Sequence, residues 1–573
     1  MGGLMAKEEE TKQGMQLLVE ALNKEGVDVI FGYPGGAVLD LYDQFFKNGT
    51  NHVLARHEQG AGHMADGYAR ASGKTGVSVV TSGPGATNIV TAVATAQMDS
   101  VPMVVISGQV AQAGIGKDAF QETDVIGVMT PITKYCVQVR DARDIPRIVK
   151  EAFYIANSGR KGVVVVDIPK NVGQQMVPVD EVNTEIYLPG YQPEKQQKIT
   201  NNEHIQNIME VIQASKKPLL LVGGGIAKAN AEEDLREFVH THKIPVVATL
   251  LGLGAVDSKD PYFLGMGGMH GSYAANMALM NTDCLINIGS RFDDRVASVP
   301  DNFAPGAKII HIDIDASEIG KVIQPDFELI ADAKVALEAL NAAALSNYQS
   351  SADWVAFHKQ NLADHPMALP EARSTIRPEA AIAYLGEKTD GEALIVTDVG
   401  QHQMWAAQFY PVRHTNQFLT SGGLGTMGYG VPAAIGAAFG AKEGQDVVAI
   451  VGDGGFQMTN QELNILSSYP VKPKFMILNN EVLGMVHQWQ DKFYGQRYSH
   501  SEFLDKNPDF VKLSEALGVK AARVSDPAEL EAAIDAMLAY DGPYVLEVRI
   551  AKDELVLPMV PAGKPNNEME GLG

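Results

Sequence analysis

One stretch of the chain restricts its fold more than any other: two apolar runs, the first of which ends in a glycine turn. Residues 447–451 are all apolar, which is typical of a buried strand, and residues 452–455 are Gly-Asp-Gly-Gly. A second run, residues 474–478, is followed by Asn479 and Asn480. With a helix between the runs, this is a βαβ unit, for which we expect a right-handed crossover and parallel strands.

The helix of this unit is predicted from its ends. Thr459 with Glu462 three residues later is the capping-box pattern of a helix start, and Pro470 ends the helix. Because the strands are parallel, we expect Asp453 and Asn480 at the same carboxyl edge of the sheet, where open α/β sheets bind ligands.

Asp453 and Asn480 suit a magnesium ion bridged to a diphosphate. Mg²⁺ takes about six oxygen ligands, usually with only one or two carboxylates and with phosphates and water as the rest. Gly454 and Gly455 leave the start of a helix open to phosphate oxygens. For the Gly-Asp-Gly sequence taken by itself, the alternative is an ordinary turn with no metal. The whole pattern resembles the cofactor motif of thiamine diphosphate enzymes, which implies that Asp453, Asn480 and the carbonyl of Val482 hold the metal.

Composition excludes several classes of protein. At 573 residues the chain is too long for one core, and its net charge of −23 argues against a nucleic-acid or acidic-membrane partner. Cys136 and Cys284 lie far apart without zinc spacing, so we expect packed or free thiols in a reducing compartment. The polar start and the absence of a long apolar run predict a cytoplasmic protein with no signal peptide and no membrane span.

Alternating strands and helices predict an α/β chain with three doubly wound parallel-sheet domains. We expect a first domain, a Rossmann-like central domain, a third domain and a tail at residues 1–190, 200–345, 375–560 and 561–573. The polar segments 190–200 and 347–377 are expected to be linkers. The tail has little to bury, so we expect it to be ordered only over a ligand.

Two parts of the chain share one layout. A small-residue helix, a strand, a glycine turn, a helix and a strand follow one another from Gly62, and the same order starts again at Gly425. Two similar units suggest a ligand held between them. A common fold used twice without functional meaning is the alternative.

Longer motifs carry a closer resemblance. RHEQGAGHMADGYARASGKTGV, VTSGPGATN, IGKDAFQETD, SRFDDRV and GDGGFQMTNQELN resemble the catalytic subunit of acetolactate synthase, also called acetohydroxyacid synthase. The resemblance covers nearly the whole chain, from Glu25 to Pro565. It implies an enzyme that decarboxylates pyruvate on thiamine diphosphate and joins the two-carbon unit to a second 2-oxoacid. The products, 2-acetolactate and 2-aceto-2-hydroxybutyrate, begin branched-chain amino-acid synthesis.

Glu58 is the first catalytic candidate. A thiamine diphosphate enzyme needs a carboxyl group beside the aminopyrimidine, where it shares a proton with a ring nitrogen so that the imino nitrogen can take the C2 proton. The local sequence alone favours an ordinary acid in a first helical turn. The resemblance assigns the activating role to Glu58. It also implies active sites between the chains of a homodimer or tetramer, and the family usually has a separate small regulatory subunit.

The resemblance implies further cofactor and substrate contacts. The other catalytic candidates are Gly36, Gln121 and Lys134; a surface glutamine and a solvated lysine are the alternatives for the last two. The substrate-binding set is Phe120, Arg295, Met485 and Trp489, in which Arg295 grips the second 2-oxoacid and Trp489 favours 2-oxobutyrate. The thiamine diphosphate contacts are Val399, Gly400, Gln401, His402, Gly425 and Met427, with Gly454 and Gly455 at the diphosphate.

The resemblance implies that the central domain binds FAD, and a glycine run with acids at strand ends suits a dinucleotide. The implied residues are Gly223, Gly224, Gly225, Thr249, Leu250, Met269, His270, Gly289, Arg291, Asp293, Arg295, Val296, Asp313, Ile314, Glu318 and Asp332. RFDDRV is the specific part of this signal, because charges after an apolar strand are costly to bury unless paired or liganded. The alternatives are an FAD-free catabolic acetolactate synthase and a pyruvate oxidase or decarboxylase of the same fold.

Overall fold

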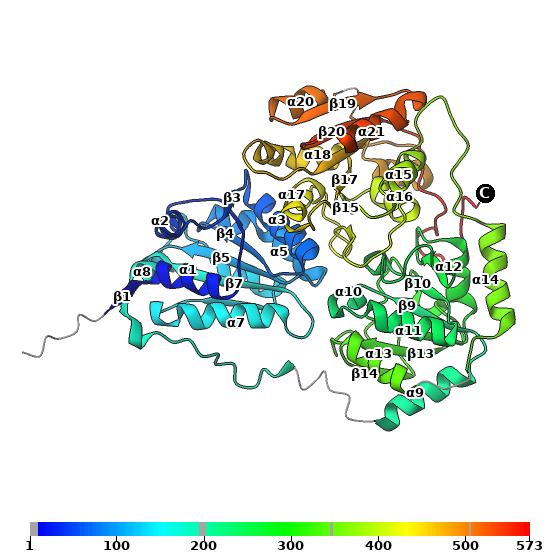
Figure 1. Cartoon of the computed structure of the whole chain (residues 1–573), viewed down its shortest axis with the longest axis horizontal. Helices are drawn as coiled ribbons and strands as arrows, with labels where there is room; N and C mark the ends of the chain where they lie inside the picture. Colours follow the sequence, from blue (N-terminus) through cyan, green and yellow to red (C-terminus); the bar gives the residue numbers. More distant parts are fainter. Residues whose placement is uncertain (1–9, 194–201, 344–347, 504–505, 573) are drawn as a thin grey trace, which may run out of the picture. The chain divides into compact units, whose positions relative to one another are not determined.

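The structure is a computed structural model that describes residues 10–193, 202–343, 348–503 and 506–572 (Figure 1). Its three large sheets each have six strands, and every strand pairing in them is parallel. This confirms the predicted α/β fold class. The described residues divide into two compact units. The first unit holds residues 10–191, 423–441 and 459–471, and the second unit holds the other described residues.

The first sheet lies in the first unit and has the strand order β3-β2-β4-β5-β7-β6. Its strands are β2 (Ile30–Gly32), β3 (His52–Leu54), β4 (Gly76–Val80), β5 (Met103–Gln109), β6 (Tyr135–Gln138) and β7 (Val163–Pro169). The accompanying helices are α1 (Gly14–Lys24), α2 (Leu39–Asn48), α3 (Glu58–Ser72), α4 (Pro84–Asn88), α5 (Val90–Met98), α6 (Val125–Met129), α7 (Ile145–Asn157) and α8 (Lys170–Gln174). A small antiparallel pair joins β1 (Thr11–Gln13) to β8 (Met176–Pro178).

The central sheet lies in the second unit and has the order β11-β10-β9-β12-β13-β14. Its strands are β9 (Pro218–Val222), β10 (Val246–Ala248), β11 (Phe263–Met266), β12 (Cys284–Ile288), β13 (Lys308–Asp313) and β14 (Phe327–Ile330). The helices are α9 (Asn202–Ala214), α10 (Gly225–Ala229), α11 (Glu232–His242), α12 (Tyr273–Asn281) and α13 (Ala333–Ala342).

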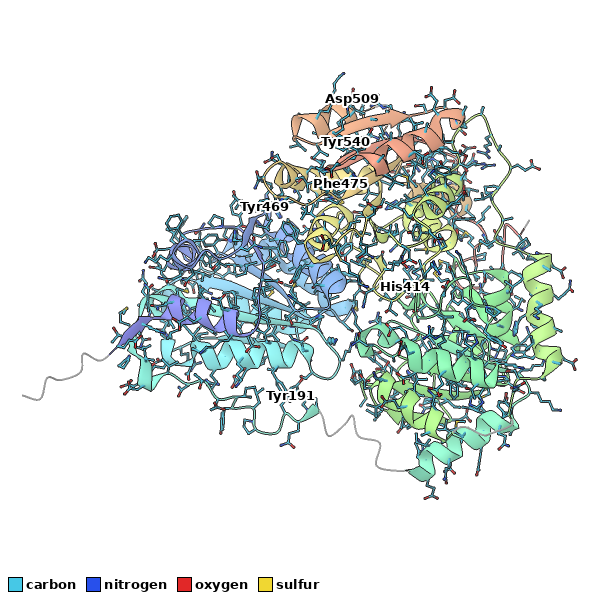
Figure 2. The ribbon with its side chains drawn as sticks, in the orientation of Figure 1. Tyr191, His414, Tyr469, Phe475, Asp509 and Tyr540 are labelled. Atoms are coloured by element: carbon cyan, nitrogen blue, oxygen red, sulfur yellow. The ribbon has the colours of Figure 1, made fainter. Side chains whose placement is uncertain are left out.

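The third sheet has the order β16-β15-β17-β18-β20-β19. Its strands are β15 (Leu394–Thr397), β16 (Phe418–Leu419), β17 (Val447–Gly452), β18 (Lys474–Asn479), β19 (Lys520–Val524) and β20 (Tyr544–Arg549). The helices are α15 (Pro378–Lys388), α16 (Gln401–Phe409), α18 (Asp453–Thr459), α19 (Gly484–Phe493), α20 (Phe510–Ala516) and α21 (Leu530–Ala539). Phe475, labelled in Figure 2, is fully buried on the central strand β18. Among the described helices, none has the length and apolar composition needed to cross a bilayer.

The two small-residue helices of the repeated layout pack directly against each other in the first unit. They are α3 and α17 (Gly430–Gly440). A Cβ atom on Gly67 would lie 2.0 Å from the carbonyl oxygen of Ala433, and one on Gly436 would lie 1.9 Å from that of Met64. Glycine at both crossing positions therefore lets the backbones of the two helices touch.

The predicted capping box is wrong. α18 already begins at Asp453, and the 3₁₀-helix η8 (Asn460–Ser467) follows it. The Thr459 hydroxyl donates to the carbonyl of Gly428 over 3.0 Å, and the Glu462 carboxylate accepts from the Arg56 backbone N–H over 2.9 Å. Both side chains therefore make tertiary contacts within the first unit instead of capping a helix.

One other segment prediction is corrected, and one lies partly outside the described residues. The expected linker 347–377 contains α14 (Ala352–Asp364), whose Trp354 is buried and donates its indole N–H to the carbonyl of Pro218 over 2.9 Å. In the tail, Val560 is buried and Asn566 donates to the carbonyl of Val296 over 2.9 Å, so these tail residues pack against the rest of the second unit. Most of the first expected linker, residues 194–200, lies outside the described residues.

Candidate active site

The carboxyl ends of β17 and β18 place Asp453 and Asn480 at one edge of the third sheet. The strands are adjacent and parallel, with Gly452 opposite Leu478. Asp453 directly follows β17 and Asn480 directly follows β18, and their side chains are only 2% and 7% exposed. The two residues therefore meet at the edge that the βαβ pattern predicts.

Asp453 is a buried carboxylate without a cationic partner. Its oxygens accept from Asn507 Nδ2 over 2.7 Å and from the Gly454 backbone N–H over 3.0 Å, and no lysine or arginine in the described part of the chain pairs with it. Burial raises the pKa of this carboxyl to about 7. A divalent cation would supply the missing positive charge, so the site fits the predicted metal.

Two glycines let the turn after β17 approach the start of α16. A Cβ atom on Gly452 would lie 2.8 Å from His402 Nδ1, and one on Gly455 would lie 2.5 Å from Asp398 Oδ1. Any larger residue at either position would push the turn away from α16. Glycine is therefore required at positions 452 and 455 by this close approach, whether or not a phosphate binds there.

His402 has a polar atom that the protein itself leaves unsatisfied. The side chain lies in the first turn of α16, beside Val399, Gly400 and Gln401, and its Nε2 is buried with no hydrogen-bond partner among the described residues. Burial lowers the pKa of this imidazole to about 3, so the ring is neutral. A buried ring nitrogen without a partner fits a site that is completed by a ligand.

Glu58 opens α3 at the carboxyl edge of the first sheet, directly after the loop from β3. Its side chain is 9% exposed, and Asn88 Nδ2 donates to Glu58 Oε2 over 3.0 Å. The other oxygen, Oε1, would lie 3.5 Å from a Cβ atom on Gly85. Glu58 is thus a fixed, nearly buried carboxyl group rather than a solvated acid of a first helical turn.

Gln121 lies in a loop between β5 and α6 that a carboxylate organises. Its φ of +61° is in the left-handed region, and its backbone packs against Gly83, where a Cβ would lie 2.8 Å from the Gln121 carbonyl oxygen. Glu122 accepts the backbone N–H groups of Ala119, over 2.9 Å, and of Gly116. Phe120 is 89% exposed in this structure. The sequence analysis did not single out Glu122, although it follows Gln121 directly.

Lys134 does not lie with Glu58 and Gln121. It precedes β6, at the amino edge of the parallel sheet, and its ammonium donates to the carbonyl of Ser158 over 2.6 Å and to that of Ile155, at the end of α7. Lys170, which the sequence analysis missed, directly follows β7 and therefore lies at the carboxyl edge. Gly36, which follows β2, is exposed at that same edge.

Gly425 and Met427 belong to a segment of the first unit that enters α17. Gly425 is exposed with φ +71°, and Met427 is partly exposed. Thr426 between them is buried and shares a hydrogen bond of 2.7 Å with the Thr95 hydroxyl on α5. The two flanking residues are therefore presented outward while the residue between them holds the segment.

The order in which strands are added to the central sheet reverses at β9. β10 and β11 extend the sheet on one side of β9, and β12, β13 and β14 extend it on the other. Ligands of open α/β sheets bind outside the carboxyl ends of the strands at such a point. The predicted flavin residues follow the carboxyl ends of the strands: residues 223–225, 249–250, 269–270, 289–296, 313–318 and 332 come after β9, β10, β11, β12, β13 and β14 in that order. The topology thus brings them to one edge.

Part of the flavin signal has a packing explanation. A Cβ on Gly223 would lie 2.2 Å from the carbonyl oxygen of Gly289, and one on Gly225 would lie 2.6 Å from its Cα. The Arg295 and Asp294 side chains, 3.9 Å apart, are 63% and 82% exposed, so the expected burial of these charges does not occur. His270 fits a ligand site better, because its buried Nε2 has no partner among the described residues.

The remaining substrate candidates lie on α19, which follows the loop after β18. Met485 is partly buried, and the Trp489 ring packs at 5.3 Å, centroid to centroid, against Phe493 one turn later. The two rings therefore form an aromatic pair on one side of α19.

Three family models match successive parts of the chain. Residues 12–128 match the N-terminal TPP binding domain of thiamine pyrophosphate enzymes, residues 205–340 match the central domain, and residues 398–548 match the C-terminal TPP binding domain. Thiamine pyrophosphate is another name for thiamine diphosphate. These matches contain both Glu58 and the Asp453–Asn480 pair.

Curated relatives are similar over nearly the whole chain. The acetolactate synthase large subunit of Lactococcus lactis is 49% identical, over 99% of this chain and 97% of the relative. The chloroplastic acetolactate synthase 1 of Nicotiana tabacum is 46% identical, over 97% of this chain and 84% of the relative. The acetolactate synthase of Mycobacterium bovis is also 46% identical, over 97% of this chain and 91% of the relative. The chain therefore belongs to the acetolactate synthase family of thiamine diphosphate enzymes.

Proposed function

We propose that Asp453, Asn480 and the backbone carbonyl of Val482 hold Mg²⁺, which binds the diphosphate of thiamine diphosphate to the third sheet. The observation that carries this proposal is the buried Asp453 carboxylate, which has no lysine or arginine partner among the described residues. One carboxylate with amide and carbonyl oxygens suits Mg²⁺, which takes its other ligands from phosphate and water. His402 Nε2 and the first backbone N–H groups of α16 would donate hydrogen bonds to the diphosphate oxygens.

Bound thiamine diphosphate supplies an electron sink that lets pyruvate lose CO₂ and pass its two-carbon unit to a second 2-oxoacid. Glu58 exchanges a proton with the aminopyrimidine ring. The hydrogen bond from Asn88 occupies Oε2 and leaves Oε1 for this exchange. The Gly425 carbonyl and the Met427 N–H hold the ring, and the Met427 side chain packs against the cofactor.

Six side chains and one glycine position the 2-oxoacids in this proposal. The Gln121 amide donates to a substrate oxygen without titrating, and Phe120 and Met485 line the pocket. Arg295 binds the carboxylate of the second 2-oxoacid, and Trp489 contacts the extra methyl of 2-oxobutyrate. Gly36 leaves room at the carboxyl edge of the first sheet. Lys170 replaces Lys134 as the lysine of the substrate path, because it lies at that edge.

We also propose that the central sheet binds FAD at the switch point beside β9. The unpartnered His270 Nε2 and the buried acids Asp313 and Glu318 support a polar ligand there. Ribose hydroxyls would donate to such carboxylates. The flavin takes no part in the carbon chemistry of this proposal.

The proposed assembly is a homodimer or tetramer with active sites between chains, joined by a separate small subunit. The name of the Lactococcus lactis relative, a large subunit, supports that partner. Cys136 and Cys284 are both free, which supports a reducing compartment, and we propose the cytoplasm.

Product analysis tests the proposed function. The purified chain is incubated with thiamine diphosphate, Mg²⁺ and FAD, and is given pyruvate with and without 2-oxobutyrate. We expect acetolactate from pyruvate alone and acetohydroxybutyrate when both acids are present. Loss of both products in Asp453→Ala, with the fold retained, is the expected result for a metal ligand.

Other products would place the chain on a different branch of the same fold. Acetaldehyde would indicate a decarboxylase and acetyl phosphate a pyruvate oxidase, and either would remove the roles given to Gln121, Arg295 and Trp489. Protein that shows no flavin absorbance can also be assayed without added FAD. Full activity under these conditions would support the FAD-free branch and contradict the proposed flavin site.

A further inference from the structure

A series of buried amide groups joins Asn480 to the segment that precedes the tail. Asn480 Nδ2 donates to Gln401 Oε1 over 3.2 Å. Gln401 Nε2 in turn donates to Gln488 Oε1 over 2.9 Å and to the carbonyl of Glu554 over 2.8 Å. Gln488 exchanges two hydrogen bonds with the backbone of Val556, accepting its N–H over 3.0 Å and donating to its carbonyl over 3.2 Å. All three amide side chains are buried, at 7% exposed or less.

The backbone fixes the direction of every amide in this series. The two ends of a side-chain amide have the same shape, so only their partners decide which end is oxygen. Val556 N–H can only donate, which makes the atom facing it Gln488 Oε1. Gln488 Oε1 and the carbonyl of Glu554 both accept, so Gln401 must turn its nitrogen to them. Gln401 Oε1 then faces Asn480, which must present its nitrogen to Gln401 and its oxygen to the other side.

We infer that Gln401 and Gln488 are positioning residues for the cation site, because through them the backbone of Glu554 and Val556 makes Asn480 present its oxygen to the metal. This inference rests on the magnesium site proposed above. Val482 N–H donates to Asn480 Oδ1 over 3.3 Å, and a carbonyl oxygen has a second lone pair for a cation. An amide turned the other way would aim two N–H groups at the ion.

The side chain of Gln401 acts through Asn480 rather than on the diphosphate. Both hydrogens of its Nε2 are already used, one by Gln488 and one by the carbonyl of Glu554. Amides also suit this place better than carboxylates would, because they orient Asn480 without adding negative charge beside Asp453.

Mn²⁺ binding tests this inference. The full chain is titrated with Mn²⁺ at saturating thiamine diphosphate, and free Mn²⁺ is followed by electron paramagnetic resonance. Partners that orient metal ligands are typically worth about 10-fold to 100-fold in metal affinity, and we expect a loss in that range for Gln401→Met. Gln488→Met should lose less, because the carbonyl of Glu554 still orients Gln401.

The control is Gln403→Met on the same helix. Gln403 is also buried, at 6% exposed, but its amide donates to the Thr420 hydroxyl and not to the series. It should bind Mn²⁺ within about twofold of wild type, since it touches neither Asn480 nor its partners. An equal loss in Gln403→Met would overturn the inference by showing a general effect of removing a buried amide.

The double variant gives the decisive comparison. If Gln488 acts through Gln401, then Gln488→Met should add almost nothing to the loss already caused by Gln401→Met. Additive losses of Mn²⁺ affinity in the double variant would contradict the inference that Gln488 acts through Gln401. Asp453→Ala separates the two proposals: wild-type Mn²⁺ binding in that variant would overturn the magnesium site itself. Loss in Asp453→Ala with wild-type binding in Gln401→Met would overturn only the positioning roles.

A conservative variant keeps the test open if Gln401→Met does not fold. A protonated carboxyl offers the same acceptor and donor as an amide, so Gln488→Glu can still accept from Val556 N–H and from Gln401. We expect Gln488→Glu to bind Mn²⁺ more tightly than Gln488→Met. Equal loss in the two variants would mean that the orientation of Gln401 does not matter.

Discussion

The Tyr429 hydroxyl donates to Asp66 Oδ1 over 2.6 Å, and both side chains are buried in the first unit. Asp66 lies on α3, the helix that Glu58 opens, and Tyr429 directly precedes α17. Arg70 Nε donates to Asp66 over 2.7 Å, and its Nη2 donates to Asp99 over 2.9 Å. These contacts join the helix of Glu58 to the segment that presents Gly425 and Met427.

Removal of Arg70 should destabilise the first unit strongly. Arg70→Met would leave Asp66 and Asp99 as buried carboxylates without their cation, and breaking a buried pair in this way costs about 3–5 kcal/mol. Tyr429→Phe removes one hydrogen bond to a charged group and should cost about 1.5–3 kcal/mol. Urea denaturation checks both values. A smaller loss for Arg70→Met than for Tyr429→Phe would contradict the pairing described here.

Glu58→Gln should keep the fold and lose most turnover. The amide retains the shape of the side chain but cannot exchange a proton with the aminopyrimidine, and such proton transfer is worth about 10²-fold to 10⁴-fold in rate. Steady-state product formation measures the loss, and a thermal melt confirms the fold. The exposed Glu387 offers a control, since Glu387→Gln should be fully active. Full activity in Glu58→Gln would remove Glu58 from the mechanism.

Glu122→Ala should weaken substrate use without weakening cofactor binding. The carboxylate holds the N–H groups of Gly116 and Ala119, and this turn carries Gln121 at φ +61°. Misplacing a contact residue by about 1 Å can cost 10²-fold, so we expect kcat/KM for pyruvate to fall about 10-fold to 100-fold. Thiamine diphosphate affinity, measured by fluorescence quenching, should not change. An unchanged kcat/KM would show that Glu122 does not set the position of Gln121.

The sequence allowed prediction of the fold class and of the Asp453–Asn480 edge because both depend on local patterns. β17 and β18 were predicted to within one residue of their observed bounds, since each is a largely apolar run followed by a turn. β6 and β14 were missed because they have mixed, half-exposed faces with no clear alternation. α14 was missed because the burial of Trp354 depends on Pro218, which lies far away in the sequence.

The candidate site was predictable to the extent that its residues follow strands. Lys134 lies at the other edge of its sheet from Glu58. The edge at which a lysine lies depends on whether it precedes or follows its strand, and β6 was not predicted. The positions of Gln488 and Asn507 depend on tertiary contacts between segments that lie far apart in the sequence. No pattern along the chain marks such contacts, so only the structure reveals them.

Glu462 should make the stability of the protein fall between mildly acidic and neutral pH. Its carboxylate is completely buried on η8, and burial raises its pKa to about 7 from 4.5. The folded chain therefore holds this proton more tightly than the unfolded chain, so the stabilising contribution is complete below pH 4.5 and is lost as the pH rises to about 7. Each pKa unit corresponds to 1.36 kcal/mol, so the full contribution of Glu462 to stability is on the order of 3 kcal/mol.

Glu462→Gln tests this directly. The amide can still accept from the Arg56 N–H, and it does not ionise, so the difference between variant and wild type should shift in favour of the variant as the pH rises from 5 to 8. Urea denaturation of both proteins at several pH values measures this difference. Glu387→Gln, which changes an exposed carboxylate, should show no such trend. A constant difference between Glu462→Gln and wild type across this range would mean that Glu462 is ionised in the folded protein throughout, with Arg56 compensating for its burial.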